Sequence, residues 1–76
     1  MTKTMSIRMD QGNYDFLTKM SKQERSDLSK AVRDLVTRGR ILLAVERYKA
    51  GDASLGKAAQ VAGLSVGQMM TLLLYV

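Results

Sequence analysis

Polar and apolar residues alternate strictly near the start of the chain. In an extended backbone, one side of residues 3–9 would carry the apolar residues Met5, Ile7 and Met9. The opposite side would carry the polar residues Thr4, Ser6 and Arg8. This period of two predicts a half-buried β-strand. Because a lone strand leaves its backbone groups unpaired, we expect two copies of the chain to pair these strands antiparallel.

The next part of the chain has the period of an amphipathic helix. Asp10 is a suitable N-cap for a short helix, whose apolar positions are Tyr14, Phe16, Leu17 and Met20. Residues 21–27 are polar and separate this helix from a second one. The second helix has apolar or small residues at helical spacing, namely Leu28, Ala31, Val32, Leu35, Val36 and Gly39. We expect Gly39 to end or bend it, because glycine is unfavourable within helices.

Three more helices are predicted in the second half of the chain. The first covers residues 41–50 and ends at Gly51, a good residue just after a helix. The second covers residues 55–62, with Ser54 as its N-cap and Gly63 as the turn that follows. The last begins after Ser65 and runs to the end of the chain. The predicted fold class is therefore mainly α with one N-terminal β-strand.

Composition and charge narrow the class of protein. The 76 residues have a net charge of +5, with no cysteine or histidine. Residues 1–51 contain 11 basic and six acidic residues. In residues 52–76 the only charged residues are Lys57 and Asp52. A basic first part is typical of a protein that binds a polyanion. Without disulfides or zinc ligands, a chain this small gains a sufficient core most easily by pairing with a second copy.

The order of strand, helix, polar turn and longer helix resembles the ribbon-helix-helix repressors of the Arc/MetJ type. The segment from Arg25 to Arg33 resembles the entry to the second helix in that family. The resemblance implies a homodimer with a C-terminal helical extension, divided into a DNA-binding and dimerisation domain (1–50) and a helix-turn-helix-like extension (51–76). It also implies that the paired strands lie in the major groove of DNA.

The resemblance assigns roles to individual residues. The base-contacting residues would be Thr4, Ser6 and Arg8, whose side chains can hydrogen bond to base edges. The phosphate-contacting residues would be Lys3, Lys22, Arg25, Ser26 and Lys30. The dimer core would consist of Met5, Ile7, Met9, Leu17, Leu28, Val32 and Leu35. By contrast, Arg33, Arg38, Arg40, Arg47 and Lys49 are expected on the solvated faces of helices.

The C-terminal extension supports a separate expectation. Residues 54–65 have the small-residue and glycine spacing of a helix-turn-helix, and residues 42–74 resemble small prokaryotic antitoxin-like proteins. The second helix of this motif has no lysine or arginine, and its end is strongly apolar. The extension can therefore bind a partner protein, pack on the dimer or make a second DNA contact. The candidate partner face is Met69, Leu72, Leu73 and Tyr75.

Together these observations predict a cytoplasmic, sequence-specific transcriptional repressor that binds double-stranded operator DNA as a homodimer. The resemblance and the apolar tail further predict an autoregulating antitoxin with a cognate toxin as partner. The alternatives are a stand-alone repressor without a toxin, and a protein-interaction module that does not bind DNA. We expect no enzymatic activity, cofactor, metal or membrane partner. The acidic residues are not paired as acid–base catalysis requires, and no apolar run is long enough to cross a bilayer.

Overall fold

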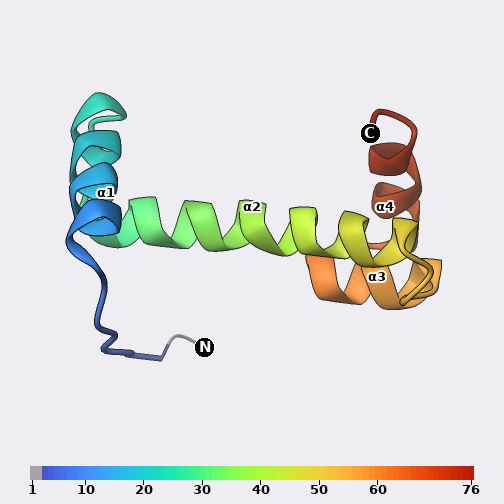
Figure 1. Cartoon of the computed structure of the whole chain (residues 1–76). Helices are drawn as coiled ribbons and strands as arrows, with labels where there is room; N and C mark the ends of the chain where they lie inside the picture. The colour runs from blue at the N-terminus through green and yellow to red at the C-terminus, as the bar shows by residue number, and fades with distance from the viewer. Residues whose placement is uncertain (1–2) are drawn as a thin grey trace. The chain divides into compact units, whose positions relative to one another are not determined.

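The computed structural model describes residues 3–76. These residues form four helices: α1 (Gln11–Gln23), α2 (Leu28–Lys49), α3 (Leu55–Ala62) and α4 (Val66–Leu73) (Figure 1). The chain divides into two compact units, Met1–Val32 and Arg33–Val76. The first five residues of α2 belong to the first unit, and the rest of α2 belongs to the second.

The expected N-terminal strand and ribbon-helix-helix fold are wrong. Residues 3–10 have no regular secondary structure, and residues 3–76 contain helices but no strand. Met5 is 81% exposed and Ile7 is 62% exposed, so neither side chain is in a core. The alternating pattern meets the side-chain requirement of a strand, but a strand also needs an adjacent backbone with which to pair. No segment within residues 3–76 supplies that backbone.

The first unit is built from α1 and the start of α2. Asp10 caps α1 as predicted, and its carboxylate accepts a hydrogen bond from the backbone N–H of Asn13 at 3.3 Å. The helix extends to Gln23, farther into the polar segment than the sequence pattern indicated. The buried residues of this unit are Leu17, Met20, Ser21 and Ala31.

The helix α2 is continuous through Gly39. The predicted end or bend at Gly39, and the separate helix over residues 41–50, are therefore wrong. One glycine costs about 1 kcal/mol in a helix, which is too little to break a helix whose other residues form it readily and in part pack against neighbours. The helix ends at Lys49, one residue before the predicted end, and the predicted turn glycine, Gly51, has a left-handed φ of 81°.

The second unit contains two short helices with well-defined ends. The helix α3 has the predicted bounds, and Ser54 accepts a hydrogen bond from the N–H of Lys57 at 3.2 Å. Gly63 follows it with a φ of 74°, a conformation that glycine adopts without steric cost. Ser65 then begins α4 with a capping box, in which its side chain and that of Gln68 satisfy each other's backbone N–H groups.

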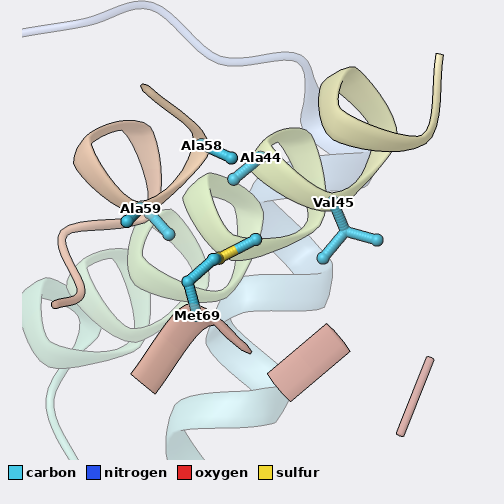
Figure 2. Close-up of a cluster of buried hydrophobic side chains, with 6 residues drawn as sticks. Ala44, Val45, Ala58, Ala59 and Met69 are labelled. Carbon is cyan, nitrogen blue, oxygen red and sulfur yellow. The ribbon is translucent and has the colours of Figure 1, made fainter. Parts of the chain in front are cut away.

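The core of the second unit joins all three of its helices. Its buried residues are Ala44 and Val45 of α2, Ala58, Ala59 and Ala62 of α3, and Met69 of α4. Figure 2 shows Met69 extending from α4 toward the other two helices. Four alanines let the helix backbones approach closely, and Met69 is the one large, fully buried side chain described. The packing therefore depends on small residues around a single large one.

The turn glycine provides a test of this local structure. Gly63→Ala should lower the free energy of unfolding by about 1–2 kcal/mol, because alanine is strained at positive φ. The added Cβ would also lie 3.2 Å from the Arg40 guanidinium. Gly56→Ala is the matched control. It lies within α3 with no atom within 4 Å of the new Cβ, so it should stabilise the chain by about 0.5–1 kcal/mol. Urea unfolding followed by circular dichroism measures both changes, and equal effects would contradict the assignment.

Candidate nucleic-acid interface

The helices α3 and α4 form a helix-turn-helix. Residues 63–65 connect them, and the two helices pack against each other, with α4 running across the direction of α3 (Figure 1). The N–H of Leu64 donates a hydrogen bond to the carbonyl of Ala59 at 2.9 Å, which closes the end of α3. DNA-binding helix-turn-helix proteins also join two packed helices by a short turn, and they place the second helix in the major groove.

The helix α4 has distinct inner and outer faces. Met69 is 0% exposed, and Leu72 and Leu73 are half-buried against the same core. The opposite side at helical spacing, which we call the α4 outer face, consists of Gly67, Met70, Thr71 and the adjoining Leu74; all four are exposed. The α4 outer face is therefore the side that the motif leaves free to contact another molecule.

Arg40 fixes the position of the helix-turn-helix on α2. Its Nε donates a hydrogen bond to the carbonyl of Val61 at 2.9 Å, and Nη2 donates one to the carbonyl of Gln60 at 3.4 Å. These carbonyls belong to the last turn of α3, where a cation is favoured by the helix dipole. The sequence placed Arg40 on a solvated face. No local pattern indicates this contact, because it joins residues 20 and 21 positions apart.

Positive charge in this unit lies outside α4. Residues 33–76 contain six basic and three acidic residues, giving a net charge of +3. The basic residues in or near the helix-turn-helix include the exposed Lys57 of α3 and the exposed Arg47 and Lys49 at the end of α2. These side chains can contact phosphates, which hold a protein on DNA without reading its sequence.

The predicted base-contacting residues lie in the exposed segment before α1. Thr4, Ser6 and Arg8 are all exposed there, as is Lys3. Their polar side chains are accessible, but no strand orders them with the spacing that the predicted ribbon required. Their contact with DNA stays a prediction.

The other predicted phosphate-contacting residues lie at the junction of α1 and α2. Lys22, Arg25 and Lys30 are exposed, and Arg25 has a left-handed φ of 52°. Asp27 caps α2 by accepting a hydrogen bond from the N–H of Lys30 at 2.6 Å. The hydroxyl oxygen of Ser26 is buried without a hydrogen-bond partner. Because this oxygen is buried, a phosphate cannot reach it in this structure.

The predicted dimer-core residues have different degrees of burial in the single chain. Leu17 is buried, Val32 and Leu35 are half-buried, and Met5, Ile7, Met9 and Leu28 are exposed. Their burial between two copies stays a prediction.

The predicted partner face is divided by the fold. Met69 was assigned to this face, but it lies at the centre of the core and is inaccessible in this fold. Leu72 and Leu73 also pack toward the core, whereas Tyr75 is exposed. The sequence missed Met70 and Thr71 as surface residues of the motif. Helical periodicity along α4 could have distinguished the two sides, because Met69 and Met70 point about 100° apart around the helix axis.

Comparison of the chain with protein-family models, curated proteins and solved structures finds no match. Within residues 3–76, no helix combines the length and apolar character needed to cross a membrane. The same residues bring together no group of three or more side chains suited to holding a metal ion. The helix-turn-helix and its surface are therefore the features of this chain that bear on function.

Proposed function

We propose that this protein is a sequence-specific DNA-binding repressor of transcription that inserts α4 into the major groove. The observation that carries the proposal is the helix-turn-helix itself, in which a three-residue turn presents the α4 outer face to solvent. The proposal keeps the function predicted from the sequence but replaces the N-terminal ribbon by α4 as the reading element.

The residues of the α4 outer face favour a particular kind of base contact. Gly67 has no side chain, so the start of α4 can approach DNA closely. The hydroxyl of Thr71 can hydrogen bond to either class of base, and Met70 and Leu74 can contact the methyl group of thymine. Because this face has no arginine to bind guanine, we expect readout to favour A·T base pairs.

Binding strength must come from residues outside α4. The exposed Arg47, Lys49 and Lys57 carry positive charge at the end of α2 and in α3. Each phosphate contact that they make would release counterions, so binding should weaken as salt concentration rises. The N-terminal basic residues Lys3 and Arg8 can add further contacts of the same kind. This division separates residues that position the protein from residues that read sequence.

Gly67→Glu provides the direct test. The full chain is mixed with randomised DNA duplexes, and the bound fraction is sequenced and its affinity measured at fixed salt. We expect enrichment of defined A·T-containing sequences by the natural chain. The variant should lose about 100-fold in affinity for them, because like charges placed together at an interface cost several kcal/mol. The new side chain should not disturb folding, since the nearest atom to an added Cβ is the Ser65 hydroxyl oxygen at 4.0 Å.

Two matched variants separate charge and size from position. Gly67→Ala introduces a methyl group without charge and should retain most of the affinity. Asn13→Asp makes the same change in net charge at an exposed position in the first turn of α1, and it should weaken binding only slightly. If Asn13→Asp and Gly67→Glu weaken binding equally, the effect is one of total charge and α4 does not read DNA. A natural chain that enriches no sequence would overturn the proposal.

A second candidate function is binding of a partner protein, as an antitoxin binds its toxin. It is favoured by the exposed apolar residues at the end of the chain, Leu74, Tyr75 and Val76. Apolar residues exposed together are typical of protein-binding surfaces. The two functions are compatible, because Tyr75 and Val76 lie beyond the four residues assigned to DNA contact.

A further inference from the structure

The helix α2 carries a second apolar face that the core of its unit does not use. Ala44 and Val45 face the core. Leu35, Val36, Leu42 and Leu43 form a face whose centre lies about 170° around the helix from them at about 100° per residue. Val36 is 57% exposed, Leu42 is 60% exposed and Leu43 is 41% exposed. We call these four residues and Gly39 the α2 stripe; all five belong to the unit Arg33–Val76.

The α2 stripe is symmetrical about Gly39. Its apolar residues lie four and three positions before Gly39, and three and four positions after it. If two copies of α2 pair antiparallel about a two-fold axis at Gly39, each residue is level with the one equally far on the other side of the axis. Val36 and Leu43 lie on one side of the centre line of the stripe, and Leu35 and Leu42 lie on the other. Val36 therefore packs beside Leu43 of the second copy, and Leu35 packs beside Leu42. An interface formed by one patch on both copies requires this self-complementarity.

Gly39 has no structural role within the described chain. An added Cβ there would meet nothing within 4 Å, and its φ is not in the left-handed region. A glycine in this position costs about 1 kcal/mol relative to alanine. A second helix crossing at Gly39 supplies a reason for it, because a residue without a side chain lets two helix backbones approach closely.

The charged residues beside the α2 stripe leave its centre apolar, as an interface with a second copy requires. Between Leu35 and Leu43 the charged residues are Arg38 and Arg40, which lie on the two sides of the α2 stripe. Arg40 is directed to the carbonyls of α3.

We propose that the protein forms a homodimer in which the two α2 helices pair antiparallel through the α2 stripe, with Gly39 at the two-fold axis. This inference concerns self-association and does not depend on DNA binding. It assigns an interface to Val36, Gly39, Leu42 and Leu43, none of which was in the dimer core predicted from the sequence.

Single cysteines test the direction and register of the pair, because the natural chain has no cysteine. Val36→Cys and Leu43→Cys are prepared as full chains, one with a tag that changes its mass, and mixed under native oxidising conditions. We expect the mixture to form the mixed disulfide dimer at least about tenfold more efficiently than either variant forms its own. In the proposed pair Val36 lies beside Leu43, about one residue apart along the axis, while the two copies of Val36 are separated by about six residues, or about 9 Å. Efficient self-linking of Val36→Cys would indicate parallel helices and overturn the proposal.

Gly39→Ala tests the interface without a cross-link. The natural chain should be dimeric in sedimentation equilibrium, and the variant should dimerise at least about tenfold more weakly, because the new methyl groups separate the helices. Gly56→Ala, the control on α3, should leave dimerisation unchanged. A natural chain that stays monomeric at all concentrations, or an unchanged dimer constant for Gly39→Ala, would overturn the proposal. A stripe covered by some other protein would give the first of these results.

Discussion

Met69→Ala should lower the free energy of unfolding of the Arg33–Val76 unit by about 2–5 kcal/mol. Truncating a fully buried methionine removes its apolar contacts and leaves a cavity that the surroundings fill only in part. Met69 is 0% exposed, and most of its buried neighbours are alanines, which are too short to fill the space. A loss of this size is a large part of the stability of a small folded unit. The measurement is urea unfolding of the full chain, followed by helical circular dichroism.

The adjacent methionine is the matched control. Met70 is 55% exposed on the α4 outer face, so Met70→Ala should change the free energy of unfolding by less than about 0.5 kcal/mol. The same variant should weaken DNA binding if α4 reads bases as proposed. Equal destabilisation by both substitutions would show that α4 is not oriented with Met69 toward the core.

The two proposals together predict a two-fold symmetric operator with half-sites about one helical turn apart. Two copies related by a two-fold axis at Gly39 present their α4 helices as a symmetry-related pair of reading elements. Dimeric helix-turn-helix proteins bind half-sites that are one helical turn of DNA apart, about 34–36 Å, or a multiple of it. Sequences enriched from random duplexes should show half-sites about 10–10.5 base pairs apart.

Spacing variants of the enriched sequence provide the measurement. Inserting about five base pairs between half-sites turns one of them to the opposite side of the DNA, and affinity should fall at least about 100-fold because only one α4 can bind. Inserting a full turn tests the rigidity of the pair and should also weaken binding, since α2 fixes the separation. Affinity that does not depend on spacing would contradict a fixed two-fold arrangement.

The sequence predicted best those features that depend on neighbouring residues. Asp10, Ser54 and Ser65 each cap a helix as expected, and Gly63 adopts the turn that ends α3. In each case the hydrogen bond or backbone conformation involves residues no more than four positions apart. All the interacting residues lie within one short stretch of sequence, so predicting these features needs no knowledge of the rest of the fold.

The wrong predictions involve competition with more distant parts of the molecule. Residues 3–9 have the side-chain pattern of a strand, but whether a strand forms depends on a pairing partner that local pattern cannot provide. Gly39 was expected to interrupt a helix, but its cost is small beside the hydrogen bonds and packing of 22 helical residues. Residues 3–9 do have a strand-like pattern, and Gly39 does disfavour a helix. In both places the surrounding structure outweighs this local preference.

The candidate site was predicted only in outline. The spacing of small residues and glycine predicted the two helices and the turn between them. Met69, however, was assigned to a binding face, and it is buried in the core. The run of apolar residues in α4 contains both core and surface positions, and hydrophobicity alone does not distinguish them. The hydrogen bonds of Arg40 to α3 lay outside any sequence pattern, because an arginine on a basic helix has many possible partners.

The alanine-rich core of the second unit has a consequence for how the sequence can change over time. Ala58, Ala59 and Ala62 have almost no exposed surface, so a larger side chain at any of them would force helices apart and cost about 1–3 kcal/mol. Met69 is flexible and can be exchanged for leucine at lower cost. Descendants of this chain that keep the fold should therefore retain small residues in α3 more strictly than the identity of the single large residue against which α3 packs.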